Sequence, residues 1–302
     1  MMYDLVIIGG GPAGMSAAVY AARYKLNAIV IAAEEGGLAA SAHEVWNFPS
    51  YKSISGFELM QKMKEQVENL KVPIANETIT GVRKTDSHFI LSLNNGVEYY
   101  AKKLIIATGT KRKKLNVPGE EEFFGKGVSY CATCDAGLFK GKKVAVVGGS
   151  NSALTAAMLI AEYASEVCII YRQEKFFRAE PAWVEAVEKN KKIKCMFQDN
   201  VKEIKGKKFV ESIALESGKE MKFDGVFVEI GSEPSNLVFK KIGIAVDDKG
   251  YIIADKDQKT NVKGVFAAGD VTNNSFKQMI VACGEGAVAC YSAYREISAG
   301  KK

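Results

Sequence analysis

One pattern occurs twice in this 302-residue chain, and it constrains the fold more than any other feature. The copies span Tyr3–Glu35 and Lys143–Glu174, about 139 residues apart. Each copy begins with a short apolar run rich in Val and Ile and continues through a glycine-rich turn. An alanine-rich segment of helical length and a second apolar run follow. The pattern predicts strand, turn, helix and strand, in that order, twice.

An uninterrupted apolar run of this kind is typical of a strand that is buried on both faces, as in a parallel sheet. A right-handed crossover through the helix places the two strands of each copy side by side and parallel. The predicted class is therefore α/β, with two Rossmann-like dinucleotide-binding domains of three layers each.

The turn of the first copy is Gly9-x-Gly11-x-x-Gly14. In such a turn Gly9 permits the tight bend, Gly11 leaves room for a pyrophosphate, and Gly14 lets helix and strand pack closely. The following helix offers free N–H groups and its positive dipole end to the phosphates. In this context the motif predicts dinucleotide binding. The acid for the ribose is left open, because Glu34 and Glu35 lie beyond the end of the apolar run.

The turn of the second copy departs from the motif at its second position, where Ser150 replaces glycine. A side chain there crowds the space that a pyrophosphate would take. Two hypotheses stay open: this domain keeps the fold without binding a nucleotide well, or Ser150 bends away and leaves the site usable. The turn residues concerned are Gly148, Ser150, Asn151 and Ser152.

The six cysteines are too few for a disulfide scaffold, and most are expected to be buried thiols. Cys131 and Cys134 differ, because they form a Cys-x-x-Cys sequence just ahead of the second copy. A thiolate in such a loop can attack a disulfide, and the adjacent Asp135 can supply a proton to the leaving thiol. Beside a dinucleotide fold, this pattern favours a redox pair over two inert cysteines. No zinc or other metal site is expected, because His43 and His88 are far apart in the sequence.

Composition excludes several other classes of protein. A net charge of +6 is a mild excess without an aromatic-basic motif, so nucleic-acid binding is not predicted. Residues 5–22 and 144–161 lack charge, but glycine-rich turns interrupt both, so a membrane span is not predicted. The first residues show no secretory signal, and the expected location is cytoplasmic.

Over nearly its whole length the chain resembles low-molecular-weight thioredoxin reductases. The resemblance rests on the segments IIGGGPAGMSAAVYAAR, EVWNFPS, IIATG, GVSYCATCD, VEIGSEP and VFAAGDV, in that order. It implies an FAD-binding domain formed by residues 1–113 and 240–302. An NAD(P)H-type domain, residues 114–239, is then inserted between them and carries the Cys-x-x-Cys. It also implies non-covalent FAD, a homodimer, a rotation between the domains during turnover, and thioredoxin as the substrate.

The resemblance further implies roles for individual residues. Cys134 would face the flavin and take its electrons, Cys131 would attack the disulfide of thioredoxin, and Asp135 would be the acid–base group. The implied cofactor-binding residues are Gly9, Gly11, Pro12, Ala13 and Gly14 at the pyrophosphate, Gly37, Leu38, Asn47, Thr108 and Gly109 near the flavin, Gly269 and Asp270 at the ribityl or phosphate portion, and Lys277 and Gln278 where the family has Arg-Gln.

The chain departs from the family at the nucleotide site of its second domain. The family's His-Arg-Arg-Asp segment reads Tyr171-Arg172-Gln173-Glu174 here, so one arginine is lost, while Arg172 and Arg178 are kept. A 2′-phosphate is doubly charged, and guanidinium groups are its usual partners. NADPH is therefore doubtful as the electron donor. Related reductases that lack these motifs take electrons from other carriers, and ferredoxin is favoured here.

Two smaller observations accompany this hypothesis. Gly36–Ala39 lacks the Gln that the family has before its flavin contacts, and the basic run Lys111–Lys114 would suit an acidic ferredoxin or a solvated surface equally. The predicted function is a flavin-dependent thioredoxin reductase with ferredoxin as donor. Two alternatives stay open: a conventional NADPH-dependent thioredoxin reductase with an atypical pocket, and a redox-sensing flavoprotein.

Overall fold

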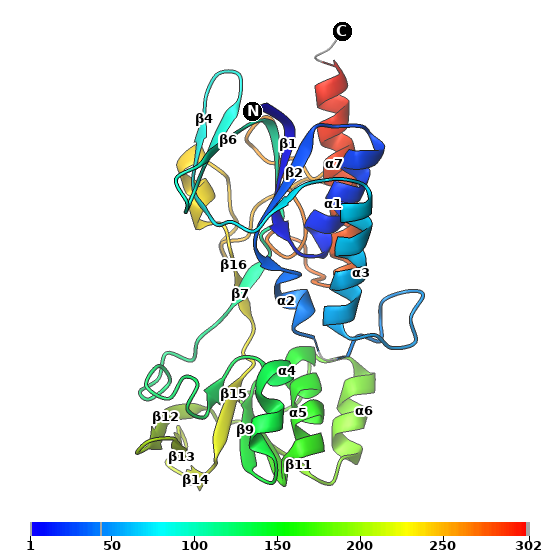
Figure 1. The fold of residues 1–302 in the computed structure, drawn as a ribbon. Coiled ribbons are helices and arrows are strands. Elements are labelled where there is room, and N and C mark those ends of the chain that lie inside the picture. The colour runs from blue at the N-terminus through cyan, green and yellow to red at the C-terminus, as the bar shows by residue number, and fades with distance from the viewer. Residues whose placement is uncertain (1, 43, 300–302) are drawn as a thin grey trace. The chain divides into compact units, whose positions relative to one another are not determined.

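The structure is a computed structural model that describes residues 2–42 and 44–299 (Figure 1). Its contacts divide the chain into two units. The first unit comprises Met1–Ala40, Val45–Lys111 and Glu233–Lys302, and the second comprises Ser41–Glu44 and Arg112–Ser232. The sequence predicts neither these end points nor the grouping of Ser41–Glu44 with the second unit. The long segment of the second unit, Arg112–Ser232, is the green to yellow part of the ribbon.

The first unit is built around a seven-stranded sheet. Its strands are β1 (Met2–Gly10), β2 (Ala28–Glu35), β3 (Ile74–Ala75), β4 (Ile79–Lys84), β5 (Phe89–Leu93), β6 (Glu98–Ile106) and β17 (Val265–Ala267). The strand order is β3-β2-β1-β6-β5-β4, and β17 also pairs with β6. β1 runs parallel to β2 and β6, whereas β4, β5 and β6 form an antiparallel meander.

Helices cover this sheet, and two of them begin where the sequence supplies a start signal. They are α1 (Pro12–Arg23), α2 (Gly37–Ala40), α3 (Gly56–Asn69), α7 (Met279–Ala299) and the 3₁₀ helix η2 (Leu237–Ile242). α1 starts with proline in its first turn, a position whose N–H has no partner within the helix. α3 starts after Ser55, whose hydroxyl accepts a hydrogen bond from the N–H of Glu58.

Two apolar cores lie on the two faces of the sheet. Leu5 and Ile7 of β1 belong to the core that includes buried residues of α1, α3 and α7. Val6 and Ile8 belong to the other core, which includes Phe239 of η2. Because successive residues of a strand face opposite sides, both faces must be apolar, which explains the uninterrupted apolar run.

The second unit repeats the arrangement with a five-stranded parallel sheet in the order β11-β10-β9-β15-β8. Its strands are β8 (Val128–Ser129), β9 (Lys143–Val147), β10 (Glu166–Tyr171), β11 (Ile193–Phe197) and β15 (Gly225–Val228). Its helices are α4 (Ala132–Asp135), η1 (Ala136–Phe139), α5 (Asn151–Tyr163) and α6 (Pro181–Lys189). A separate antiparallel sheet contains β12 (Val201–Gly206), β13 (Val210–Leu215) and β14 (Glu220–Lys222).

The chain passes between the units at two strands that pair with each other. These are β7 (Thr110–Arg112) and β16 (Ser232–Pro234), which form a two-stranded sheet. The predicted α/β class is confirmed: parallel strands β3, β2, β1, β6 and β17 carry the first Rossmann-type unit, and the five-stranded sheet of the second is wholly parallel. Among residues 2–42 and 44–299, no helix combines the length and the apolar character needed to cross a bilayer.

Candidate functional site

The Cys-x-x-Cys sequence forms a disulfide in the second unit. Cys131 and Cys134 are joined with their Cα atoms 5.3 Å apart. Cys131 caps the short helix α4, and its Sγ accepts a hydrogen bond from the N–H of Cys134 at 3.2 Å. The four remaining cysteines are free thiols, and of these Cys195 is exposed. Cys131 and Cys134 are therefore the cysteines of the described residues that can take part in thiol–disulfide exchange as a bonded pair.

The carboxylate of Asp135 lies on the same helical turn as the disulfide. The N–H of Asp135 donates to the carbonyl oxygen of Cys131 at 3.1 Å. The hydroxyl of Ser129 donates to Oδ2 of Asp135 at 2.6 Å and accepts from the N–H of Cys131 at 3.0 Å. Thr133, between the cysteines, donates to the carbonyl oxygen of Ser41 at 2.6 Å. The disulfide and the Asp135 carboxylate are thus held in one local hydrogen-bond network.

The first glycine-rich turn contains two glycines that packing requires and one that borders free space. A Cβ on Gly9 would lie 2.1 Å from the carbonyl oxygen of Ala107, and a Cβ on Gly14 would lie 1.9 Å from that of Gly9. By contrast, a Cβ on Gly11 would meet nothing nearer than the carbonyl oxygen of Gly36 at 3.9 Å. Gly11 caps α1, so bare backbone and the start of a helix border this space, as pyrophosphate binding needs.

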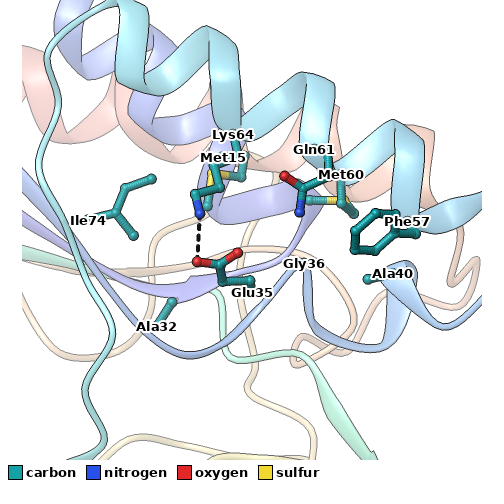
Figure 2. Close-up of a pocket in the computed structure, with 11 residues that line it drawn as sticks. Met15, Ala32, Glu35, Gly36, Ala40, Phe57, Met60, Gln61, Lys64 and Ile74 are labelled. Atoms are coloured by element: carbon teal, nitrogen blue, oxygen red, sulfur yellow. Dashed lines mark hydrogen bonds and ion pairs between the residues drawn. The ribbon is translucent and has the colours of Figure 1, made fainter.

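A cavity lies beside this turn, where β2 ends (Figure 2). Gly10, Ala32 and Glu35 line it together with residues of α3, among them Lys64. Lys64 Nζ lies 2.6 Å from Oε1 of Glu35, and this hydrogen bond is the main reason why the pKa of Glu35 is lowered. Burial along β2 ends at Ala32, but the strand continues to Glu35, which pairs with Gly10 after a shift in register. Of the two acids that the sequence leaves open, only Glu35 lines the cavity, so it is the one that could accept hydrogen bonds from a ribose there.

The other residues expected near the flavin all lie in the first unit. Pro12 and Ala13 are in the first turn of α1, Gly37 and the exposed Leu38 are in α2, and Gly109 and Gly269 have positive φ. The amide of Asn47 donates to Oε1 of Gln278 at 3.1 Å, although the two residues are far apart in the sequence. Thr108 donates to the carbonyl oxygen of Ser235 at 2.5 Å.

Asp270 and Lys277 form a partly buried charged group. Burial raises the pKa of Asp270, and the nearby Lys277 opposes that rise. Burial also lowers the pKa of Lys277, whose ammonium lies 4.1 Å from the ring centre of Tyr251 and donates to the carbonyl oxygen of Thr272. Among the described residues the Asp270 carboxylate has no hydrogen-bond donor, so it remains able to accept from a cofactor hydroxyl.

These observations fit FAD. The space at Gly11 suits a pyrophosphate, Glu35 in the cavity suits a ribose, and the Asp270 carboxylate suits a ribityl hydroxyl. No cluster of three or more potential metal ligands occurs in residues 2–42 and 44–299; His43 lies outside the described residues.

The second glycine-rich turn is filled differently. Gly148 is required by packing, because its Cβ would lie 2.1 Å from the carbonyl oxygen of Glu229. A Cβ on Gly149 would lie 2.5 Å from the ring of Tyr171. Ser150 caps α5 without a side-chain hydrogen bond. In the first copy the position of Tyr171 is occupied by Ala32, which lines the cavity. An aromatic ring thus stands where the first unit has a small side chain.

Side-chain contacts hold the segment that follows Tyr171 against the second glycine-rich turn. Tyr171 stacks on Phe176 and Phe177, with ring centres 5.9 and 6.3 Å apart. Asn151, in the first turn of α5, accepts from the N–H of Glu180 at 2.7 Å and donates to its Oε1 at 3.0 Å.

The polar residues expected at this second turn have other partners or face solvent. Arg178 lies over the Phe177 ring at 5.3 Å, and Arg172 is exposed. Ser152 is exposed, and its backbone carbonyl oxygen accepts a hydrogen bond from the Thr155 hydroxyl.

Comparison with known proteins agrees with this geometry. The family described as pyridine nucleotide-disulphide oxidoreductase matches residues 3–286. The chain belongs to this family. A thioredoxin reductase of Peptoclostridium acidaminophilum is 40% identical over 99% of this chain and 98% of its own length. The resemblance to low-molecular-weight thioredoxin reductases is confirmed, and membership of the family implies FAD.

Two solved structures are informative. Thioredoxin reductase of Lactococcus lactis in its FR conformation has a TM-score of 0.95 and 36% identity, covering 98% of this chain and 99% of its own. A ferredoxin-flavin thioredoxin reductase of Clostridium acetobutylicum has a TM-score of 0.55 and 33% identity, covering 99% of each chain. This family therefore includes relatives named for a donor other than a nucleotide.

The sequence names Glu35 only as one of two open candidates, because the apolar run ends before it. It does not point to Ser129 or to Glu120, which supports the segment around the disulfide. Ser129 and Glu120 gave no local signal, because their roles come from partners that the fold brings to them. Glu120 is buried and accepts hydrogen bonds from the Tyr130 hydroxyl and from the N–H groups of Leu115 and Asn116.

Proposed function

We propose that this protein is a flavin-dependent thioredoxin reductase, in which electrons reach FAD, pass to the Cys131–Cys134 disulfide and leave to thioredoxin. The observation that carries the proposal is the disulfide on a turn that also holds the Asp135 carboxylate, in a chain of the pyridine nucleotide-disulphide oxidoreductase family. Close relatives named thioredoxin reductase support the substrate.

The chemistry divides between the two units. FAD, when bound in the first unit, supplies two-electron transfer to a disulfide. In the second unit Cys131 is the sulfur proposed to attack the disulfide of thioredoxin, with Cys134 as the sulfur that faces the flavin. Asp135 directly follows Cys134 and its N–H donates to the carbonyl oxygen of Cys131, so it is the acid that we propose to carry protons between the sulfur atoms.

For the electron donor we favour ferredoxin over NADPH. Three features of the second glycine-rich turn support this preference: Ser150 in the place of the second glycine, the Tyr171 ring against Gly149, and Gln173 in the place of an arginine. The relative named ferredoxin-flavin thioredoxin reductase supports the same donor. A conventional NADPH-dependent reductase with an atypical pocket is the alternative.

The basic run Lys111–Lys114 adds little to this preference. Lys111 pairs with Glu233 at 3.0 Å, Arg112 with Glu229 at 2.7 Å, and Lys114 with Glu121 at 2.8 Å. Charges that are already paired attract an acidic protein less strongly, so the run is not a reason to prefer ferredoxin.

A homodimer in the cytoplasm completes the proposal. Helices α1 and α7 pack against each other in the first unit. Large side chains on their outer surfaces remain exposed, namely Tyr20 of α1 and Val288 and Tyr291 of α7. An exposed apolar group of this kind suits a subunit contact. The four free thiols suit a reducing compartment.

The experiment that tests the disulfide chemistry does not depend on the donor. The purified flavoprotein is reduced anaerobically with dithionite, excess reductant is removed, and oxidised thioredoxin is added. Wild type should generate thioredoxin thiols, whereas Cys131→Ser and Cys134→Ser should not. Cys195→Ser is the control, because this exposed free thiol lies outside the disulfide and should leave the rate unchanged. Thiol formation by Cys134→Ser at the wild-type rate would exclude the proposal.

A further inference from the structure

Ser129 occupies an unusual place beside the redox pair. It is the last residue of β8 and is 3% exposed, so its hydroxyl is shielded from water. Its Oγ lies 2.6 Å from Oδ2 of Asp135, 3.0 Å from the backbone nitrogen of Cys131 and 3.4 Å from the carbonyl oxygen of Cys131. One buried hydroxyl therefore contacts both the proposed acid–base group and the backbone of the attacking cysteine.

The hydrogen-bonding capacity of a serine decides the direction of these contacts. A hydroxyl has one proton to donate and two lone pairs to accept with. The N–H of Cys131 can only donate, so it occupies a lone pair of Ser129. The hydroxyl proton then goes to the nearer acceptor, the carboxylate of Asp135, at a distance typical of a charge-assisted O–H to carboxylate bond.

The strand that carries Ser129 is itself held in place. β8 pairs in parallel with β15, with Ser129 opposite Phe227. The hydroxyl of the next residue, Tyr130, donates to the buried carboxylate of Glu120 at 2.6 Å, and burial raises the pKa of Tyr130. Ser129 is therefore a fixed point from which the Asp135 side chain can be oriented.

We infer that Ser129 is a positioning residue that holds the carboxyl group of Asp135 in reach of the sulfur atoms for proton transfer during thiol–disulfide exchange. This inference rests on the proposed function, in which Asp135 is the acid–base group. Nothing in the Cys-x-x-Cys sequence itself assigns such a role to Ser129, which acts through Asp135 and touches no reacting sulfur.

The exchange balances with Asp135 as the proton carrier. The Cys131 thiolate attacks one sulfur of the partner's disulfide and forms a mixed disulfide with it. The partner's own S–S bond breaks, and its leaving thiolate takes a proton from the Asp135 carboxyl group. The Cys134 thiol then gives its proton to the Asp135 carboxylate and attacks Sγ of Cys131. The Cys131–Cys134 disulfide forms again as the mixed disulfide breaks. The partner's second sulfur leaves as a thiolate and takes the proton from Asp135. Two electrons and two protons have moved to the partner.

Proton delivery to the leaving thiolate can be measured separately from a structural role of Ser129. The aromatic thiol released from 5,5′-dithiobis(2-nitrobenzoate) leaves as a stable thiolate and needs no proton, whereas the alkyl thiol from bis(2-hydroxyethyl) disulfide does. The dithionite-reduced holoenzyme is mixed with each compound, and with oxidised thioredoxin. The ratio of the alkyl to the aromatic rate constant then reports proton delivery, because general damage to the fold or the cysteines lowers both rates.

For Ser129→Ala we expect the ratio of the alkyl to the aromatic rate constant to fall about tenfold. This fall is smaller than the full effect of removing the acid, because Asp135 is still present. Asp135→Asn should lower the ratio at least as much, and Ser129→Ala added to Asp135→Asn should lower it no further. Ser129→Thr keeps the hydroxyl and should restore most of the ratio. Tyr130→Phe is the matched control, because it removes a hydrogen bond next to Ser129 without touching Asp135, and its ratio should equal that of wild type.

A wild-type ratio in Ser129→Ala would overturn the inference, and so would an additional loss in the Asp135→Asn background. The thioredoxin arm separates this inference from the proposed function. If wild type reduces both small disulfides but not thioredoxin, the proposed substrate is wrong, while the ratio still decides the role of Ser129.

Discussion

Glu229 and Arg112 form a largely buried ion pair in the second unit, with Oε1 of Glu229 2.7 Å from Nη1 of Arg112. The glutamate side chain is 8% exposed and that of the arginine 23%. Arg112 also donates to the hydroxyl of Ser41, so the pair connects β7 with the segment Ser41–Glu44. Burial raises the pKa of Glu229 to about 7 even though Arg112 opposes the rise.

This pair makes the stability of the second unit depend on pH. An exposed glutamate loses its proton near pH 4.3 to 4.5, roughly, whereas folded Glu229 keeps it to about pH 7. The folded state therefore binds more protons between these values, and the stabilisation from protonated Glu229, complete below about pH 4.5, is lost as the pH rises through 7. We expect Glu229→Gln to lose less stability than wild type between pH 5 and pH 8, measured as the shift in thermal midpoint.

Arg112→Ala should destabilise the second unit, and more strongly at high pH. At pH 8 the substitution leaves a buried carboxylate without its partner, which costs about 3 kcal/mol or more. At pH 5.5 Glu229 is protonated and needs the arginine less. Urea unfolding at both pH values measures the difference. An equal loss at both would show that Glu229 does not titrate in this range.

The glycines of the first turn provide a pair of substitutions with opposite expected outcomes. Gly14→Ala places a Cβ 1.9 Å from the carbonyl oxygen of Gly9, so the helix and strand must separate and stability should fall by about 3 kcal/mol or more. Gly11→Ala meets no protein atom within 3.9 Å and should fold normally. It should nevertheless weaken FAD binding roughly tenfold or more, because the methyl group takes pyrophosphate space.

Thermal unfolding of the apoprotein and titration with FAD separate these two effects. An unchanged FAD affinity in folded Gly11→Ala would mean that the cofactor phosphates lie elsewhere.

Glu35→Gln should weaken FAD binding without unfolding the protein. Glu35 lies in the cavity at the end of β2, and a carboxylate accepts ribose hydroxyls better than an amide does. We expect about a tenfold higher dissociation constant for FAD, measured by flavin fluorescence. Glu34→Gln is the matched control, because the neighbouring Glu34 is exposed and does not line the cavity. Equal losses in both variants would contradict a specific role for Glu35.

The second glycine-rich turn can be tested by restoring the residues that the family has. Ser150→Gly combined with Gln173→Arg returns backbone space for a pyrophosphate and one guanidinium for a 2′-phosphate. This double variant should gain saturable flavin reduction by NADPH, with a smaller gain for NADH. If wild type already reacts as fast with NADPH as the double variant does, the departures in this turn do not limit nucleotide use.

The sequence predicted the fold class well because the repeat is a strong and local signal. Apolar runs, glycine-rich turns and alanine-rich segments are consequences of buried parallel strands and the helices that cover them, so they can be recognised without any partner. The Cys-x-x-Cys sequence and Asp135 were recognisable for the same reason, since they are adjacent along the chain.

What the sequence missed depends on long-range contacts. β2 continues past its buried portion to Glu35 because backbone pairing with Gly10 sustains it after burial has ended. The grouping of Ser41–Glu44 with the second unit involves Arg112 and Thr133, far along the chain. Ser129 looks like any other serine until the fold brings it against Asp135. Such contacts leave no periodic pattern that a sequence could display.

The most direct test of the proposed function follows electrons from donor to product. NADPH, NADH and chemically reduced ferredoxin are added anaerobically, each in a separate run, to the flavoprotein with oxidised thioredoxin. Loss of the flavin band and formation of thioredoxin thiols are recorded together. We predict that ferredoxin supports both and that neither nucleotide does at a comparable rate. Rapid, saturable turnover with NADPH would contradict the proposed donor, and flavin reduction without thioredoxin thiols from any donor would contradict the reductase itself.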